Sequence, residues 1–182
     1  MPLSESALIG KHNAYNSLAA GIVARIFELK KEVIKESMAS FHNLEHRLEF
    51  IAKINDIRFI NDSKATNVNS TWYALETFEQ PIIWIAGGVD KGNDYTDLIP
   101  LVQKKVKAIV CLGEDNRPIH EAFAKEVDLI VNTKSAQEAA KISYQLASKG
   151  DLVLLSPACA SFDLFEDYED RGRQFKQAVR SL

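Results

Sequence analysis

The chain has 182 residues, of which 46% are hydrophobic and 26% charged, and its formal net charge is -3. This composition can bury a core and argues against disorder, and two cysteines are too few for a disulfide framework, so we expect Cys111 and Cys159 to be reduced thiols. The sequence has no long basic run, no signal-peptide pattern and no apolar run near the roughly 18 residues of a membrane span, which argues against nucleic-acid and membrane partners and predicts a soluble, cytoplasmic protein.

The N-terminal part is expected to form one long helix over residues 16–38, because apolar residues recur on one face at spacings of three and four. Those residues are Leu18, Ile22, Ile26 and Leu29. One helix has too little apolar surface to fold alone. We therefore expect residues 1–43 to be the tail of a preceding domain and residues 44–182 to form a domain of their own.

From residue 48 onward, short apolar runs alternate with amphipathic segments. The predicted strands are 48–54, 57–61, 82–88, 108–114, 128–131 and 152–158, and the predicted helices are 68–79, 94–106, 115–125, 135–148 and 162–180. The Asn55-Asp56 turn between the first two strands indicates an antiparallel hairpin at one edge of the sheet. The fold class is therefore α/β: a Rossmann-like, doubly wound, mainly parallel sheet with one antiparallel hairpin, preceded by a helical tail.

Unusual polar clusters follow four of the predicted strands. They are "NDSKATN" (61–67), "GGVDKGNDY" (87–95), "GEDNRP" (113–118) and "SPACASFD" (156–163). Loops at the carboxyl ends of parallel strands meet at one edge of a sheet, which is where ligands bind in such folds. For "GEDNRP" an ordinary turn with a helix cap explains the residues better than a binding site.

Two residues in these loops are candidates for binding an anion. Lys91 stands between glycines that permit close approach of a ligand, although a solvated loop lysine is an equal alternative. Ser161 is expected near a helix N-terminus, where a hydroxyl and amides suit a carboxylate, although a plain N-cap serine is equally compatible. The sequence has no Walker A loop, no G-x-G-x-x-G and no G-x-S-x-G elbow.

The four histidines do not form a zinc-binding pattern. His42 and His46 are four residues apart, but they lie in an expected linker without a third ligand. We expect no metal site in this sequence.

Five motifs, in this order, resemble the C-terminal portion of the Mur ligase family over essentially the whole chain. They are "GKHNAYNSLAA", "HRLEF", "NDSKATN", "GGVDKG" and "SPACASFDLFEDYEDRG". The third motif and "SPACASFD" are typical of the member that adds D-glutamate. The resemblance implies an ATP-dependent amide ligase of peptidoglycan synthesis, in which ATP and Mg²⁺ activate the carboxylate of UDP-N-acetylmuramoyl-L-alanine as an acyl phosphate and the amine of D-glutamate attacks it.

The resemblance also implies roles for individual residues. Arg47 is implied to reach the ATP phosphates and is the catalytic candidate. The implied ATP-binding residues are His12, Asn13, Asn16, Arg47 and Asp62, and the implied D-glutamate-binding residues are Lys64, Thr66, Lys91, Ser161 and Tyr168. Tyr168 stands where the family often has phenylalanine, so the resemblance does not give the contact of its hydroxyl. Lysines and hydroxyls are suitable donors for two carboxylates, and the planar fork of arginine suits phosphate oxygens.

The family's nucleotide-binding loop, magnesium ligands, carbamylated lysine and UDP-sugar domain cannot be located in this sequence. We therefore expect a fragment in which residues 1–43 end the central ATPase domain and residues 44–182 form the amino-acid-binding domain. Such a fragment lacks its partner domains, retains neither ATP nor Mg²⁺, and has no ligase turnover alone.

Two alternatives differ in mechanism or class. A related folylpolyglutamate-type ligase would be expected to lack "SPACAS". A stand-alone receiver-like binding domain would need a pair of acids after the first parallel strand and a phosphoacceptor aspartate after the third, and the loops do not complete that set.

Overall fold

The computed structural model describes residues 11–41 and 44–182, and only the backbone of Lys11 and His12. The chain divides into two compact units, Met1–Leu44 and Glu45–Leu182, which are considered separately below. Within the described residues, none of the helices combines the length and the hydropathy that crossing a membrane requires.

The first unit contains two helices, α1 (Lys11–Ile26) and α2 (Lys31–Ser40), so the prediction of one helix over residues 16–38 was wrong. Helix α1 ends in a Schellman-type turn, in which the Leu29 amide donates to the Ala24 carbonyl (3.0 Å) and the Glu28 amide to the Arg25 carbonyl (3.0 Å). Glu28 takes the left-handed conformation (φ 57°) that glycine usually supplies there. The sequence has no glycine at the end of α1, and the apolar spacing continues past Ile26, so the pattern alone did not reveal the end of the helix.

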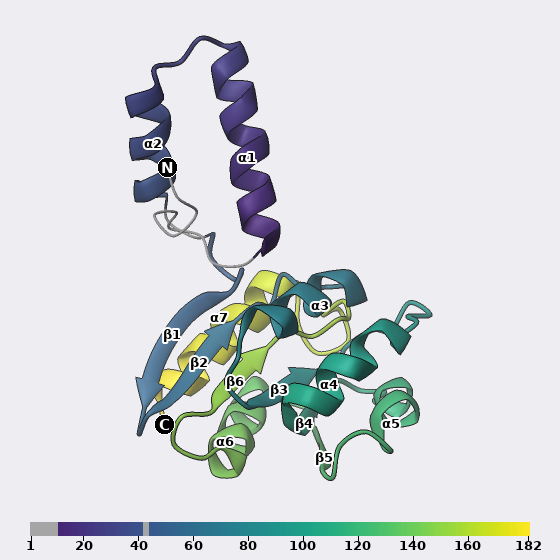
Figure 1. Ribbon diagram of the computed structural model, residues 1–182. Helices are drawn as coiled ribbons and strands as arrows, with labels where there is room; N and C mark the ends of the chain where they lie inside the picture. The colour runs from purple at the N-terminus through teal and green to yellow at the C-terminus, as the bar shows by residue number, and fades with distance from the viewer. Residues whose placement is uncertain (1–10, 42–43) are drawn as a thin grey trace. The chain divides into compact units, whose positions relative to one another are not determined.

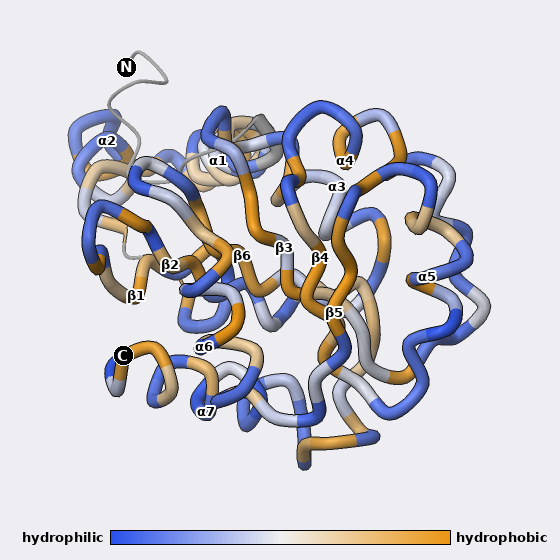
Figure 2. The backbone as a smooth tube through the Cα atoms, turned by 90° about the horizontal axis from the view of Figure 1, so that it is seen from below, coloured by the Kyte–Doolittle hydropathy of each residue, from blue (hydrophilic) through white to orange (hydrophobic). Residues whose placement is uncertain are grey.

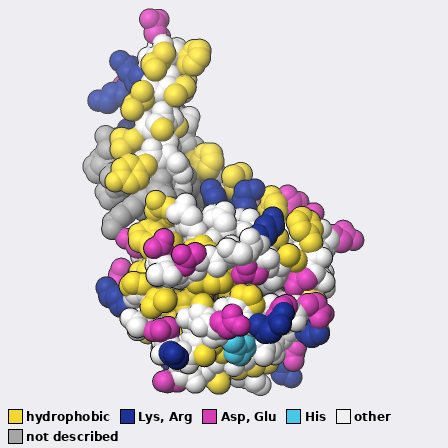
Figure 3. All heavy atoms as spheres, turned by 90° about the vertical axis from the view of Figure 1, so that its right-hand side faces the viewer, with side chains coloured by type: hydrophobic (Ala, Val, Ile, Leu, Met, Phe, Trp, Pro, Cys, Tyr) yellow, Lys and Arg dark blue, Asp and Glu magenta, His cyan; other side chains and the backbone are white. Residues whose placement is uncertain are grey.

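The helices of the first unit expose many large apolar side chains (Figure 3). The exposed set on α1 and its C-terminal turn is Tyr15, Leu18, Ile22, Val23, Ile26, Phe27 and Leu29. The face predicted to be apolar is therefore present, and most of it lies in solvent within this unit.

The second unit is built on a six-stranded sheet with the order β1-β2-β6-β3-β4-β5 (Figure 1). The strands are β1 (Glu49–Ile54), β2 (Ile57–Asn61), β3 (Ile82–Ala86), β4 (Val106–Leu112), β5 (Ile130–Thr133) and β6 (Leu152–Leu155). Only β1 and β2 pair antiparallel, and every other neighbouring pair is parallel. Asn55 and Asp56 both have positive φ (49° and 68°), as a two-residue hairpin turn requires. The predicted fold class is confirmed.

Helices cover both faces of this sheet (Figure 2). On one side lie α3 (Val68–Thr77), the short 3₁₀ helix η2 (Thr96–Leu98), α4 (Ile99–Lys105) and α5 (Arg117–Phe123); on the other lie α6 (Ala136–Leu146) and α7 (Tyr168–Arg180). Successive residues of β3 alternate between the two cores, with Trp84 packed on the first side and Ile83 and Ile85 on the second. Because both faces are covered, the central strands read as continuous apolar runs.

A buried lysine completes the end of helix α3. The Lys105 ammonium donates to the carbonyl oxygens of Leu75 (3.1 Å), Glu76 (3.0 Å) and Phe78 (2.7 Å). These are carbonyl groups that a helix C-terminus leaves without intrahelical partners. Lys105 therefore stabilises the helix end at the amino edge of the sheet, away from the loops that carry the polar motifs.

Helix α7 begins at Tyr168, six residues later than predicted. Asp167 caps it by accepting from the Asp170 amide at 2.6 Å. Ser161 instead begins a separate turn, in which its carbonyl oxygen accepts from the amides of Leu164 (3.3 Å) and Phe165 (3.0 Å). The expectation that Ser161 lies at this helix N-terminus was therefore wrong.

Candidate functional site

The polar loops that follow β2, β3, β4 and β6 leave the sheet at the same edge, because these strands are parallel. Strand β6 lies between β2 and β3, so the loop 156–163 stands between the loops 62–67 and 87–95. Hydrogen bonds join this middle loop to both neighbours: the Ala158 amide donates to the Ala65 carbonyl (3.0 Å), and Val89 and Ala160 exchange backbone bonds (2.9 and 3.3 Å). We call the four loops 62–67, 87–95, 113–118 and 156–163 together the rim.

Asp62 is buried at the base of the rim. Its carboxyl oxygens accept from the Leu48 amide (3.1 Å) and the Ser156 hydroxyl (2.9 Å). Burial raises the pKa of Asp62 to about 7, against the lowering effects of these two hydrogen bonds and of the half-buried, positively charged Arg47. The carboxyl is thus fixed in position and interacts electrostatically with Arg47.

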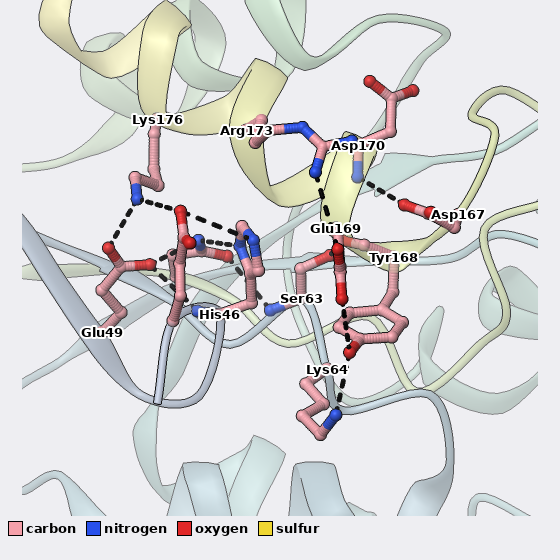
Figure 4. A network of polar contacts seen from close by, with 12 residues as sticks. His46, Glu49, Ser63, Lys64, Asp167, Tyr168, Glu169, Asp170, Arg173 and Lys176 are labelled. Carbon is pink, nitrogen blue, oxygen red and sulfur yellow. Dashed lines mark hydrogen bonds and ion pairs between the residues drawn. The ribbon is translucent and has the colours of Figure 1, made fainter. Parts of the chain in front are cut away.

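Lys64 and Tyr168 come together from distant parts of the chain (Figure 4). The Lys64 ammonium donates to the Tyr168 hydroxyl at 2.9 Å and lies 4.5 Å from the centre of its ring. That hydroxyl donates in turn to Glu169 (3.1 Å), whose other oxygen lies 3.6 Å from Arg173. The extra hydroxyl of Tyr168 therefore orients Lys64, which keeps donors for a further ligand.

Lys91 is exposed on the loop after β3, at a position set by the residues around it. Asp90 accepts from the amides of Gly92 (2.6 Å) and Asn93 (2.9 Å) and from the Tyr95 hydroxyl (2.5 Å). Burial favours a higher pKa for Asp90, but these hydrogen bonds outweigh it and the pKa is lowered. The carboxylate therefore stays ionised and holds the loop in shape.

Gly88 permits the close contact between this loop and its neighbour. Its φ is 125°, and a Cβ atom there would lie 2.1 Å from the carbonyl oxygen of Ala160. Only glycine fits at this position, which explains one of the two consecutive glycines noted in the sequence.

Thr66, Lys91 and Ser161 share one property: within residues 11–41 and 44–182, no side-chain hydrogen bond or ion pair involves them. Ser161 is nevertheless buried (2% exposed), and Thr66 is half-buried. These two hydroxyl groups and the Lys91 ammonium therefore keep their hydrogen-bond donors for a ligand.

The loop after β4 forms the expected turn, but its N-cap residue Asn116 makes no side-chain capping hydrogen bond to α5. Asp115 accepts from both the amide (3.1 Å) and the side chain of Arg117, and the Asn116 side chain donates to the Gly113 carbonyl (3.1 Å). Its link to the rest of the rim is the Glu114 amide, which donates to Asp163 at 3.0 Å.

His46 belongs to a polar cluster beside β1, and His42 lies outside the described residues. Glu45, His46 and Glu49 have potential ligand atoms within 4.8 Å of one another. However, the Lys176 ammonium lies 2.7 Å from each glutamate, so a cation of the protein already pairs with both carboxylates (Figure 4). Burial lowers the pKa of His46, which keeps the ring neutral. This cluster anchors the chain next to Arg47.

The remaining candidates lie in the first unit, on α1. Asn13 is buried and Asn16 is exposed, whereas the side chain of His12 is outside the described part of the chain. All three are described only within that unit.

Arg171 is a rim residue that the sequence reasoning did not single out. It is 1% exposed and hydrogen-bonds to the loops 61–67 and 156–163. A signal was present: Arg171 precedes Phe175 and Val179 by four and eight residues, so a charged residue falls on the apolar face of α7. Cys111 and Cys159 are both buried and free, as expected.

Comparison with known proteins gives a consistent result. A family model described as "Mur ligase, glutamate ligase domain" matches residues 46–159. The UDP-N-acetylmuramoylalanine–D-glutamate ligase of Christiangramia forsetii is 63% identical over 182 residues, which are 100% of this chain and 41% of that protein. The enzyme of the same name from Porphyromonas gingivalis is 52% identical over 97% of this chain and 39% of its own length. The chain thus spans about two fifths of the length of these relatives.

Solved structures share the fold at low sequence identity. The UDP-N-acetylmuramate–alanine ligase of Thermotoga maritima superposes with a TM-score of 0.69 at 16% identity, covering 96% of this chain and 39% of that one. A folylpolyglutamate synthase of Mycobacterium tuberculosis in complex with ADP gives a TM-score of 0.64 at 16% identity, covering 94% and 41%. None of these comparisons supports the receiver-like alternative. By its match to the family model and by its curated relatives, this chain belongs to the Mur ligase family.

Proposed function

We propose that this chain is the D-glutamate-binding portion of a longer ATP-dependent amide ligase, which adds D-glutamate to UDP-N-acetylmuramoyl-L-alanine in peptidoglycan synthesis. The observation that supports it best is the rim itself, where Lys64, Thr66, Lys91 and Ser161 offer donors to a ligand on adjoining loops. Relatives that are 63% and 52% identical carry the name of this activity.

The rim suits a small dicarboxylate. D-Glutamate presents two carboxylates, each of which needs cationic or hydroxyl donors to replace water. Lys91 and Ser161 are assigned as the main carboxylate binders, with Thr66 and Lys64 beside them and Tyr168 as an aromatic wall. Binding through the carboxylates leaves the amine free. The amine attacks the acyl phosphate, the new C–N bond forms, phosphate leaves, and the nitrogen loses its proton.

The nucleotide is assigned to the other side of the loop 61–67. Arg47 is proposed to contact phosphate oxygens and Asp62 to accept from the ribose, because a carboxyl group has lone pairs beyond the two used by Leu48 and Ser156. His12, Asn13 and Asn16 are proposed to contact the adenine side. Mg²⁺, held elsewhere in the ligase, would neutralise charge on the phosphates during transfer.

The same proposal assigns the two parts of the chain to two domains of the ligase. Residues 1–43 are proposed to end a central ATPase domain, and residues 44–182 to be the amino-acid-binding domain. The UDP-sugar and ATPase domains would supply the rest of the reaction in the cytoplasm, and the 182-residue chain alone would show no turnover.

The test is a hybrid ligase in which this chain replaces the matching segment of the Christiangramia forsetii enzyme. We expect ADP release that depends on D-glutamate and not on L-glutamate. Lys91→Met and Ser161→Ala should each raise the KM for D-glutamate by about tenfold or more, because a charged hydrogen bond contributes about 1.5–3 kcal/mol, and leave the KM for ATP unchanged.

Lys125→Met is the matched control. Lys125 is also exposed and its side chain makes no hydrogen bond or ion pair in the described chain, but it follows α5 at the amino edge of the sheet. Its replacement should change neither KM. A hybrid whose ADP release does not depend on D-glutamate, or equal effects of Lys91→Met and Lys125→Met, would refute the proposal.

A further inference from the structure

Arg171 is the most deeply buried charged residue among those the structure describes, at 1% exposure. It lies on the first turn of α7, on the face that packs against the sheet with Phe175 and Val179. An arginine in this environment requires an explanation, because charged side chains are rarely fully buried.

The guanidinium hydrogen-bonds to two of the three loops to which the substrate donors belong and lies close to Gly88 in the third. Its Nε atom donates to the Ser63 hydroxyl (3.0 Å), and one terminal nitrogen donates to the Ser63 carbonyl (2.9 Å). Both terminal nitrogens donate to the Cys159 carbonyl, each at 3.2 Å. A Cβ atom on Gly88 would lie 3.3 Å from one of these terminal nitrogens, Nη1. Ser63 precedes Lys64, Cys159 lies two residues before Ser161, and Gly88 lies three before Lys91.

The charge of Arg171 is not neutralised by an ion pair in the described chain. Burial lowers its pKa to about 10, and Cys159 and Asp163 act in the opposite direction, so the group stays protonated at neutral pH. Two carbonyl oxygens and the Ser63 hydroxyl accept from it, and none of these groups carries a net charge. Arg171 therefore keeps a positive charge below the loops that would receive two carboxylates.

Lys105 shows what a purely structural buried cation looks like in the same fold. It donates to three carbonyl oxygens, whereas Arg171 donates to two and a hydroxyl, and it lies at the end of α3, at the amino edge of the sheet. Its contacts reach no rim loop. The position of the charge, rather than its burial, is what distinguishes Arg171.

We propose that Arg171 is a positioning residue for the dicarboxylate substrate: it fixes the spacing of the loops that carry Lys64, Lys91 and Ser161. This inference rests on the proposed function. The planar fork of arginine holds two loops at once, whereas a lysine ammonium would reach one carbonyl at a time.

The first experiment measures amide hydrogen exchange in the 182-residue chain by mass spectrometry. Arg171→Met should raise exchange by about tenfold or more in the loops 62–66 and 158–163, because their hydrogen bonds to the guanidinium are lost. The loop 87–93 should follow in the same direction, because Val89 is hydrogen-bonded to Ala160. Lys105→Met, the matched control, should raise exchange near the end of α3 and leave the rim unchanged. Ser63→Ala, a milder change, should affect the rim loops in the same direction as Arg171→Met.

The second experiment uses the hybrid ligase. Arg171→Lys should raise the KM for D-glutamate by on the order of tenfold to a hundredfold, because displacement of binding groups by about 1 Å has effects of this size, with the KM for ATP unchanged. Lys105→Met should lower thermal stability without altering either KM.

The outcomes separate the two proposals. Unchanged exchange in the rim loops of Arg171→Met, or an unchanged KM for D-glutamate in Arg171→Lys, would overturn the positioning role. An unmodified hybrid without D-glutamate-dependent turnover would count against the proposed function instead. The exchange measurement needs no turnover and would still decide whether Arg171 orders the loops.

Discussion

Replacing Asp62 with asparagine should change how the stability of the second unit depends on pH. In the folded chain the carboxyl holds its proton until about pH 7, whereas its ordinary pKa is 3.8. Between these values the folded state binds more protons than the unfolded state, so the free energy of unfolding falls as pH rises. Asparagine has a similar shape, keeps an acceptor for the Leu48 amide and does not titrate.

The size of the effect follows from the two pKa values. The difference between about 7 and 3.8 corresponds to a ceiling of about 4 kcal/mol, at about 1.4 kcal/mol per pH unit. At pH 5 the unfolded chain has already lost its proton, so about 3 kcal/mol of this change remains between pH 5 and pH 8. The Ser156 hydroxyl keeps a partner in the variant, because the Thr71 hydroxyl lies 3.2 Å away.

The assay is urea unfolding followed by tryptophan fluorescence at pH 5, 6, 7 and 8. Trp72 and Trp84 are the two tryptophans of the chain, and both lie in the second unit, so the signal reports that unit. Asp56→Asn is the control. Asp56 is exposed, and its pKa is lowered by Lys53, so its replacement should shift stability equally at all four pH values.

A difference in unfolding free energy between Asp62→Asn and the unmodified chain that stayed constant from pH 5 to pH 8 would contradict the raised pKa of Asp62. If it rises as expected, the same variant in the hybrid ligase should bind ATP more weakly although it folds more stably at pH 8. A gain in stability combined with a loss of function is the expected sign of a residue retained for its chemistry.

Two further predictions concern the rim. Gly88→Ala places a Cβ atom 2.1 Å from the Ala160 carbonyl oxygen at a φ of 125°, so it should destabilise the second unit by about 2 kcal/mol or more in the same urea assay; an effect below about 0.5 kcal/mol would show that the loops are not packed as described. Tyr168→Phe removes the acceptor of Lys64 but keeps the ring, so the KM for D-glutamate should rise less than about tenfold in the hybrid ligase; a larger rise would mean that the hydroxyl binds substrate directly.

Much of the second unit could be predicted because its local signals agree with its packing. The central strands are apolar throughout since both faces are covered, and the polar loops stand out against them. The hairpin turn at Asn55 and Asp56 was also evident, because these residues tolerate positive φ. The placement of the polar loops at one edge then followed from the parallel order of the strands alone.

The incorrect or missed predictions concern places where the local sequence does not carry the residue that commonly marks such a feature. Glu28 takes the left-handed conformation that glycine commonly marks, so the end of α1 was missed. The start of α7 was placed too early, because Phe165 lies at helical spacing from later apolar residues and is buried (9% exposed) from a separate turn. Arg171 was overlooked because its partners are backbone carbonyls more than ten residues away, which no local pattern encodes.

The energetics of the rim support a role beyond holding the fold together. Burial opposes the charge of both Asp62 and Arg171, raising one pKa and lowering the other. Buried charges contribute little to stability compared with well-packed apolar residues of similar size, which fill the rest of both cores. Both groups are also tied to the loop after β6, Asp62 through Ser156 and Arg171 through Cys159. The loop after β6 lies between the loops after β2 and β3. A substrate that binds to one of these loops therefore finds the other two already held in position. Unfavourable burial concentrated at such a junction is what a binding site requires and a purely structural turn does not.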